Sequence, residues 1–216
     1  MTASSTNTND TGEFNGKRVL VTGGTKGAGK AIADRFLKGS ATVVITARSA
    51  PAEYTGAHFI QADVSTSEGT AHVIREMLSG FKGVDIIVHN VGGSSAPSGG
   101  FITVTDELWQ QAMDENLYPA VRLDRGLLPN MIERGSGVII HVSSIQRTLP
   151  LYDSTLAYAA AKAALTNYSK ALSNEVSPLG VSRDCFPGIY RNRNSSAPLE
   201  RLSRNDNSSS AAEPRA

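Results

Sequence analysis

The fold is decided by residues 18–30, which read RVLVTGGTKGAGK. The β-branched run at 18–22 predicts a strand, the glycines predict a tight turn, and the apolar spacing of residues 30–37 predicts a helix. At such a strand-to-helix turn, glycines allow backbone N–H groups to approach a pyrophosphate at the helix N-terminus. The stretch therefore predicts a dinucleotide site built on Thr22, Gly23, Thr25, Lys26, Gly27 and Gly29.

Two other interpretations of this turn remain open. It could be a plain tight turn that binds nothing. Residues 24–30 also satisfy the Walker A spacing Gly-x-x-x-x-Gly-Lys of phosphate-binding loops, but the next residue is Ala31, which has no hydroxyl to offer a magnesium ion. The Walker A interpretation is therefore the weaker one.

Strands and helices alternate along the rest of the chain. We expect further strands at 41–46, 59–62, 84–89 and 137–142, and helices at 70–78, 105–133 and 155–176. Pro119 and Pro129 are expected to bend or split the second of these helices. The nearly continuous Val and Ile runs are typical of strands covered on both faces. The predicted fold class is α/β, a Rossmann-type doubly wound parallel sheet with helices on both faces.

Length and composition set the domain organisation. The chain has 216 residues, enough for one substantial core, and we expect one domain over residues 14–190. Residues 1–13 are rich in Ser, Thr and Asn, and residues 191–216 are polar, with few aromatics and no hydrophobic period. We therefore expect two disordered tails.

Charge, cysteine and histidine content disfavour several classes of function. The formal net charge of +1 offers no basic field for nucleic acid, and the single Cys185 cannot form an internal disulfide framework or a zinc ribbon. We expect no metal, because His58, His72, His89 and His141 lack ligand spacing; the last two, at strand ends, are expected in the core or at the sheet edge. The sequence contains no apolar run of membrane-spanning length, so a cytoplasmic protein without membrane contact is expected.

Five motifs lie in order along the predicted elements. They are Thr-Gly-x-x-x-Gly-x-Gly from Thr22, His89-Asn90-Val91-Gly92, Asn116, Ser143-Ser144 and Tyr158-x-x-x-Lys162. Together they resemble the short-chain dehydrogenase/reductase family, and the similarity runs from about Gly16 to Gly188. The resemblance implies hydride transfer between a nicotinamide cofactor and a carbonyl or secondary alcohol in a small-molecule substrate. It also implies a homo-oligomer for a complete relative.

The resemblance assigns cofactor choice to the end of the second strand. A carboxylate there accepts hydrogen bonds from a ribose 2′-OH and repels a 2′-phosphate. Here the strand ends Thr46-Ala47-Arg48-Ser49, without an acid, and Arg48 and Lys26 supply positive charge instead. NADP(H) is therefore favoured over NAD(H), although both cations could equally belong to a solvated surface loop.

The remaining cofactor contacts follow from the resemblance alone. It assigns Asp63 to the adenine, with a helix N-cap as the alternative role of Asp63, and it also implies Val64 in cofactor binding. It assigns Asn90 to the support of the sheet beside the cofactor. The other residues implied in cofactor binding are Gly92, Tyr158, Lys162, Pro187 and Gly188.

The resemblance also implies the catalytic residues. Reduction of a carbonyl leaves an alkoxide that needs a proton, and the family uses Tyr158 as the acid, Ser144 as the donor that orients the substrate oxygen, and Lys162 as the supporting cation. Tyr158 and Lys162 lie four residues apart, so they share one helix face, and a nearby cation favours the phenolate form. Asn116 matches an asparagine that holds a water in a proton relay to the lysine.

Each catalytic assignment has an ordinary structural alternative. Ser143 competes with Ser144. In an Ala-rich helix, Tyr158 could be a core residue and Lys162 a surface residue whose stem covers apolar groups. Asn116 could be an unremarkable amide in the middle of a helix.

The chain departs from the family pattern near its end. After Pro187-Gly188 it continues Ile189-Tyr190-Arg191-Asn192-Arg193 and then the polar tail, so the final strand and helix of the family fold are expected to be missing. Reading the back-translated codons one nucleotide later permits the family-like Pro-Gly-Phe-Ile-Glu-Thr-Glu. We therefore hypothesise a frameshift around residues 181–184, which resequencing the gene tests. Two further expectations follow. The alternative to an active oxidoreductase is an inactive fragment or a non-catalytic dinucleotide-binding protein. Assembly into a homo-oligomer is in doubt, because relatives commonly use the missing region for contacts between subunits.

Overall fold

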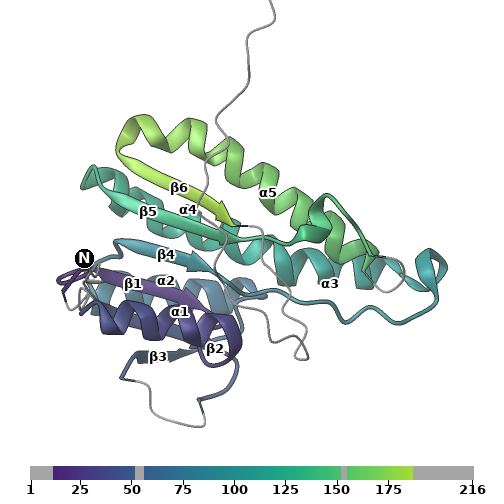
Figure 1. Cartoon of the computed structure of the whole chain (residues 1–216), viewed down its shortest axis with the longest axis horizontal. Coiled ribbons are helices and arrows are strands. Elements are labelled where there is room, and N and C mark those ends of the chain that lie inside the picture. Colours follow the sequence, from purple (N-terminus) through teal and green to yellow (C-terminus); the bar gives the residue numbers. More distant parts are fainter. Residues whose placement is uncertain (1–11, 52–55, 152–154, 187–216) are drawn as a thin grey trace, which may run out of the picture.

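One six-stranded sheet forms the centre of the molecule (Figure 1). The computed structural model describes residues 12–51, 56–151 and 155–186. All strand pairs are parallel, in the order β3-β2-β1-β4-β5-β6. The strands are β1 (Arg18–Thr22), β2 (Thr42–Ala47), β3 (His58–Gln61), β4 (Ile86–His89), β5 (Gly137–Val142) and β6 (Val181–Phe186).

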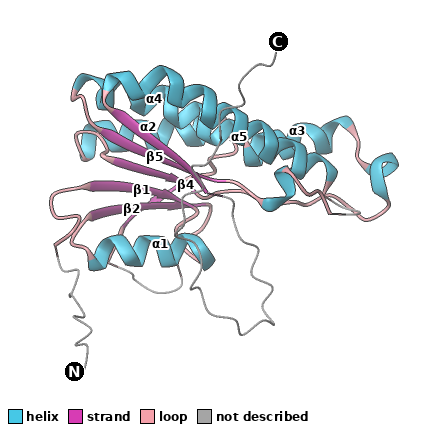
Figure 2. Cartoon of the chain, turned by 45° about the horizontal axis from the view of Figure 1, so that its top comes forward, coloured by secondary structure: helices cyan, strands magenta, loops and turns pink. Residues whose placement is uncertain are grey.

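Helices cover both faces of this sheet, as Figure 2 shows, with α1 on one side and α2, α4 and α5 on the other. The five α-helices are α1 (Gly27–Lys38), α2 (Ser67–Gly80), α3 (Asp106–Asn116), α4 (Tyr118–Glu133) and α5 (Leu156–Val176). Three short 3-10 helices complete the described elements: η1 (Gly100–Thr103), η2 (Ile145–Arg147) and η3 (Ser177–Leu179). The α/β doubly wound parallel fold is thus confirmed. None of the helices in the described part of the chain is both long enough and apolar enough to cross a membrane.

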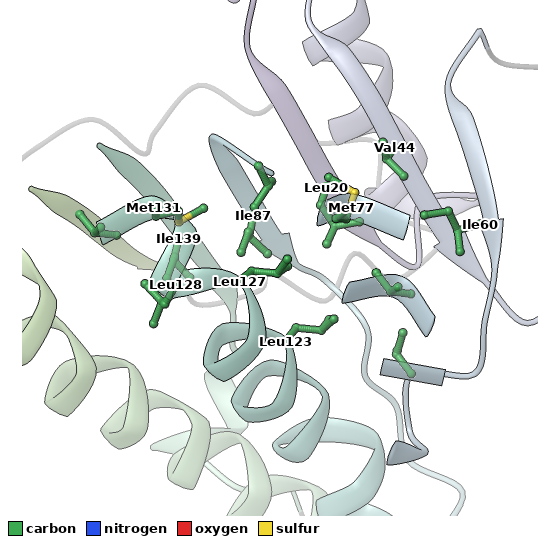
Figure 3. Close-up of a cluster of buried hydrophobic side chains, with 14 of the residues drawn as sticks. Leu20, Val44, Ile60, Met77, Ile87, Leu123, Leu127, Leu128, Met131 and Ile139 are labelled. Carbon is green, nitrogen blue, oxygen red and sulfur yellow. The ribbon is translucent and has the colours of Figure 1, made fainter. Parts of the chain in front are cut away.

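Alternation along the central strands divides the apolar side chains between two cores. Leu20, Ile87 and Ile139 belong to the larger core, which packs them against α2 and α4 (Figure 3). Val19 and Val21 belong to the second core, with Phe36 of α1. Burial on both faces explains why these strands read as continuous apolar runs in the sequence.

The predicted elements are all present, with ends that differ by up to three residues. The long helix predicted at 105–133 is split, as expected, but at Leu117 rather than at a proline. Pro119 sits in the first turn of α4, where its missing N–H costs nothing, and Pro129 is tolerated inside the helix. The strand β6 was not predicted as a separate element, and it pairs with β5 over its whole length.

An ion-pair cluster ties the amino ends of the strands together. Asp85, just before β4, accepts hydrogen bonds from Arg18 at 2.7 Å and from Arg134 at 3.0 Å. Burial alone would raise the pKa of the Asp85 carboxyl, but the hydrogen bonds and charges of the two arginines bring that pKa below its ordinary value. This cluster lies at the end of the sheet opposite to the glycine turn.

We predict that Leu127→Ala lowers the free energy of unfolding by about 2–5 kcal/mol, because it leaves a cavity in the larger core. Leu127 is fully buried there, whereas Leu149 is 63% exposed. The control Leu149→Ala should therefore change the same quantity by less than about 0.5 kcal/mol. Urea unfolding measures both; equal losses in the two variants would contradict the described core.

Candidate functional site

The turn after β1 brings its backbone close to the start of α1. Gly23 and Gly27 have φ values of +68° and +57°, in the left-handed region that favours glycine. A Cβ on Gly29 would lie 2.2 Å from the carbonyl oxygen of Gly23, so no larger residue fits where the helix meets the turn. The three glycines thus allow a tight strand-to-helix turn that leaves backbone groups accessible to a ligand.

Asn90 joins this turn to the end of β4. Its backbone N–H donates to Thr22 Oγ1 at 3.0 Å, and its side-chain amide donates to the carbonyl oxygen of Thr22 at 3.2 Å. Val91 N–H also donates to Thr22 Oγ1, at 3.2 Å. The carboxyl ends of two strands far apart in sequence are therefore held as one unit.

A cavity of about 540 Å³ opens beside this joined edge. It lies where the strand order reverses between β1 and β4, which is where open α/β sheets bind their ligands. Predicted cofactor residues that line it are Gly23, Thr25, Lys26, Arg48, Asp63, Val64, Asn90 and Gly92. Thr22, Gly27 and Gly29 shape the turn at its margin. Pro187 and Gly188 lie outside the described residues.

Two cations face the cavity from different elements. Lys26 is the residue that caps α1, and Arg48 directly follows β2. Lys30, the residue that the Walker A interpretation needs, forms an ion pair with Asp34 at 2.8 Å, one turn further along α1. That contact favours the dinucleotide interpretation of the turn.

Asp63 does not cap the next helix. Thr66 is the N-cap of α2, and its side chain accepts a hydrogen bond from the N–H of Gly69 at 3.0 Å. The Asp63 carboxylate instead accepts hydrogen bonds from the backbone and hydroxyl of Ser65, at 3.0 and 2.7 Å. The alternative role suggested by the sequence is therefore wrong, and Asp63 stays on the cavity wall.

Lys162, Asn116 and Gly92 converge at the edge of the sheet. Lys162 is only 3% exposed, and its Nζ donates to the carbonyl oxygen of Val142 at 3.0 Å. A Cβ on Gly92 would lie 2.7 Å from both Lys162 Nζ and Asn116 Oδ1, so this glycine makes room for both polar groups. The surface-lysine alternative is therefore wrong.

Asn116 ends α3 at the break before α4, so it is not a mid-helix amide. Its side-chain oxygen accepts from Gly93 N–H at 3.0 Å, and its side-chain nitrogen donates to the carbonyl oxygens of Gly93 and Ala112, both at 2.9 Å. The amide thus holds the loop after β4 against the end of α3.

The two serines after β5 have different environments. Ser143 Oγ lies 2.7 Å from Thr166 Oγ1 and donates to the carbonyl oxygen of Lys162, so it is tied to α5. Ser144 caps η2, where its Oγ accepts a hydrogen bond from Gln146 N–H at 3.2 Å. Tyr158 is half-buried one turn before Lys162, whose Nζ lies 5.9 Å from the tyrosine ring centroid.

A buried polar cluster lies next to this edge, and the sequence did not predict it. His89 Nε2 is 2.7 Å from one Asp124 carboxylate oxygen, while His141 Nε2 and Tyr168 OH are 3.2 and 2.9 Å from the other. The histidines were correctly expected at strand ends, but Asp124 was not recognised as their partner. The missing signal is the strand register, which pairs His89 directly with His141.

The cluster perturbs two of its own members. Burial alone would raise the pKa of the Asp124 carboxyl, but the charges and hydrogen bonds of the two histidines bring that pKa well below its ordinary value. Burial, together with the neighbouring Asp124 carboxylate, raises the pKa of Tyr168 far above its ordinary value. Asp124 is therefore ionised, and Tyr168 keeps its proton.

The cavity also has polar lining residues that sequence reasoning missed. They include Thr46 and Ser49 at the end of β2, Ser65 after β3, and Glu115 beside Asn116. Thr46 Oγ1 is buried and has no hydrogen-bond partner among the described residues. No motif marks these positions, because the way strands and helices pack brings them to the cavity.

The chain is similar to known oxidoreductases in sequence. A family model described as short chain dehydrogenase matches residues 17–193. A short chain dehydrogenase of Pseudocercospora fijiensis is 33% identical over 79% of this chain and 58% of its own length. The 3-oxoacyl-(acyl-carrier-protein) reductase of Escherichia coli is 32% identical over 78% of this chain and 71% of its own length.

The fold is shared with solved structures as well. L-sorbose reductase from Gluconobacter frateurii, complexed with NADPH and L-sorbose, superposes with a TM-score of 0.74 and 36% identity, over 81% of this chain and 69% of the reductase. The chain thus spans 58% to 71% of the length of these three relatives. Because the family match extends from β1 through β6, this chain belongs to the short-chain dehydrogenase family.

Proposed function

We propose that this chain is an NADP(H)-dependent oxidoreductase that exchanges hydride between nicotinamide and a carbonyl or secondary-alcohol substrate. The observation that carries the proposal is the convergence of Lys162 and Asn116 on Gly92, at the rim of the dinucleotide cavity. Lys162 is only 3% exposed, and its ammonium reaches this edge, where it donates to the carbonyl oxygen of Val142.

The residues around the cavity fit the shape and chemistry of a dinucleotide. Close approach of a pyrophosphate requires a turn without side chains. At Gly29 the neighbouring backbone leaves no space for a side chain. The buried hydroxyl of Thr46, in the cavity wall, has no hydrogen-bond partner among the residues that the structure describes. When bound, the cofactor supplies the hydride that the protein itself cannot provide.

Cofactor preference follows from charge at the end of β2. Arg48 and Lys26 face the cavity from two elements, so a 2′-phosphate there gains two cationic partners. No acid lies between Thr46 and Ser49 to accept a ribose hydroxyl. L-sorbose reductase, which is 36% identical, is described in complex with NADPH, which agrees with this preference.

Within this proposal Tyr158 is the proton donor and Ser144 orients the substrate oxygen. Ser144 rather than Ser143 takes this role, because the Ser143 hydroxyl is already bound to α5. Lys162 Nζ lies 5.9 Å from the centroid of the Tyr158 ring, so the cation and the proton donor are neighbours. Asn116 and the carbonyl oxygen of Val142 hold the end of this path in place.

A second candidate is a dinucleotide-binding protein without turnover. This chain spans 58% of the length of the Pseudocercospora dehydrogenase and 69% of that of L-sorbose reductase. The two candidates agree on cofactor binding and differ only in catalysis. Measuring binding and turnover separately therefore distinguishes them.

Tyr158→Phe should reduce turnover of NADPH with a ketone panel by about 10²–10⁴-fold, because the variant lacks the proton donor. Its dissociation constant for NADPH should stay within about two-fold, since the ring is retained. Tyr118→Phe, at the start of α4, is the matched control and should keep full turnover. The catalytic role of Tyr158 is supported if Tyr158→Phe loses substrate reduction but still binds NADPH, while Tyr118→Phe keeps both. Absence of turnover in the unaltered chain favours the second candidate.

Replacing both Lys26 and Arg48 with Ala should weaken NADPH binding by roughly 10–100-fold, the size expected from losing charge-assisted hydrogen bonds. Binding of NADH should change by less than about three-fold, because it has no 2′-phosphate. Arg75→Ala, on the exposed face of α2, removes a cation far from the cavity and serves as control. Fluorescence titration measures all three proteins; equal losses for NADPH and NADH would show that the cations do not select the 2′-phosphate.

A further inference from the structure

The buried cluster of His89, His141, Asp124 and Tyr168 connects four elements at one point. β4 and β5 contribute the histidines, α4 contributes Asp124, and α5 contributes Tyr168. Asp124 and His141 have no exposed surface, and His89 is only 4% exposed. Burying so many polar groups is costly unless each is well paired, so the cluster needs an explanation that core packing does not give.

Strand register explains its geometry. His89 and His141 are direct neighbours on adjacent parallel strands, and their rings stack with centroids 4.9 Å apart at an angle of 9°. That separation is close to the ordinary spacing of paired strands, about 4.8 Å. Each ring therefore presents its Nε2 to a different oxygen of the one Asp124 carboxylate.

This arrangement suits hydrogen bonds better than metal coordination. The ligand atoms of His89, Asp124 and His141 lie within 4.8 Å of one another, close enough for a metal site to be considered. However, a metal ion needs nitrogen lone pairs that converge on one point, and nearly parallel rings on neighbouring strands direct theirs side by side. The three residues instead form a clamp in which one carboxylate bridges two strands.

The Asp124 carboxylate is held by hydrogen bonds from three side chains. The groups that hydrogen bond to the buried Asp124 carboxylate are two imidazoles and a phenol, none of which is a permanent cation. The second ring nitrogen of His141, Nδ1, lies 2.8 Å from Ser169 Oγ. His89 Nδ1 has no hydrogen-bond partner among the described residues, so a proton there would leave a buried donor unpaired.

The clamp acts one residue before the site on both strands. His89 precedes Asn90, which holds the glycine turn through Thr22. His141 precedes Val142, whose carbonyl oxygen receives the Lys162 ammonium at 3.0 Å. If β4 shifted along its axis relative to β5, the loop that begins at Asn90 would therefore move relative to the Lys162 ammonium.

We propose that Asp124 is a positioning residue, which bridges His89 and His141 through its two carboxylate oxygens and so holds the carboxyl ends of β4 and β5 in catalytic alignment. The proposal rests on the oxidoreductase function proposed above. Asp124 touches neither cofactor nor substrate in this account and acts only through the two strands. Among the described residues, Glu175 and Arg125 also influence the Tyr168 phenol by their charges.

Asp124→Asn tests the proposal, because it removes the charge and keeps the side-chain shape. We expect kcat to fall about ten-fold or more, as reacting groups are displaced, while the KM for the carbonyl substrate changes less than about three-fold. Backbone amide NMR signals of residues 90–92 and 142–144 should shift. In the unaltered protein, imidazole ¹⁵N signals should show a hydrogen-bonded Nε2 on both His89 and His141.

Asp85→Asn is the matched control, since Asp85 also bridges elements through ion pairs, which are partly exposed, but lies at the opposite end of β4. This control should lower the unfolding midpoint. It should keep kcat within about two-fold of the unaltered protein and leave the amide signals of residues 90–92 unshifted. Tyr168→Phe is a milder second variant if Asp124→Asn does not fold. It removes only one hydrogen bond to Asp124 and should lower kcat about two- to three-fold.

Three results would overturn the proposal. Unchanged kcat and amide signals in a folded Asp124→Asn protein would reduce the clamp to a stability element. An equal loss of kcat in Asp85→Asn would show that loss of any ion pair at the sheet lowers kcat, and not loss of the clamp in particular. Stoichiometric metal that is lost with Asp124→Asn would make the cluster a metal site. If the unaltered chain lacks turnover, the oxidoreductase function fails by itself, and the amide and imidazole signals still decide the clamp.

Discussion

The link between Thr22 and Asn90 is the constraint on which the rest of the site depends. Parallel pairing of β1 with β4 brings two chain segments 68 residues apart to the same sheet edge. The hydroxyl of Thr22 then fixes the loop after β4, and the side chain of Asn90 fixes the glycine turn. Without this link the cavity would have two independent walls. With it, the dinucleotide of the proposed function would meet one joined surface, which lowers the entropy cost of binding.

A second constraint acts on the other side of the same edge. β5 lies beside β4, and its last carbonyl group receives the ammonium of Lys162 from α5. Gly92 leaves the space in which that lysine and Asn116 approach each other. The site is thus a property of three neighbouring strands, and each contributes a loop whose polar groups the next element holds in place. Hydride transfer between two bound molecules depends strongly on such alignment.

Much of this could be predicted from the sequence, for physical reasons. Continuous apolar runs reveal strands buried on both faces, and the glycine turn reveals where backbone must approach a ligand closely. The break at Leu117 was only partly predicted, because proline at the first turn of a helix is favourable and so does not mark the break itself. The Asp124 clamp could not be predicted, since it depends on which histidines the strand register places side by side. Local sequence carries no information about that register once strands are separated by long crossovers.

Binding of a reduced dinucleotide to the cavity is the central claim, and one titration tests it most directly. The purified chain is titrated with NADPH while the fluorescence of the reduced nicotinamide is followed, with NADH as the competing ligand. The account predicts saturable binding of one NADPH per chain, tighter than binding of NADH. Absence of saturable binding to a folded chain, or tighter binding of NADH, would contradict it.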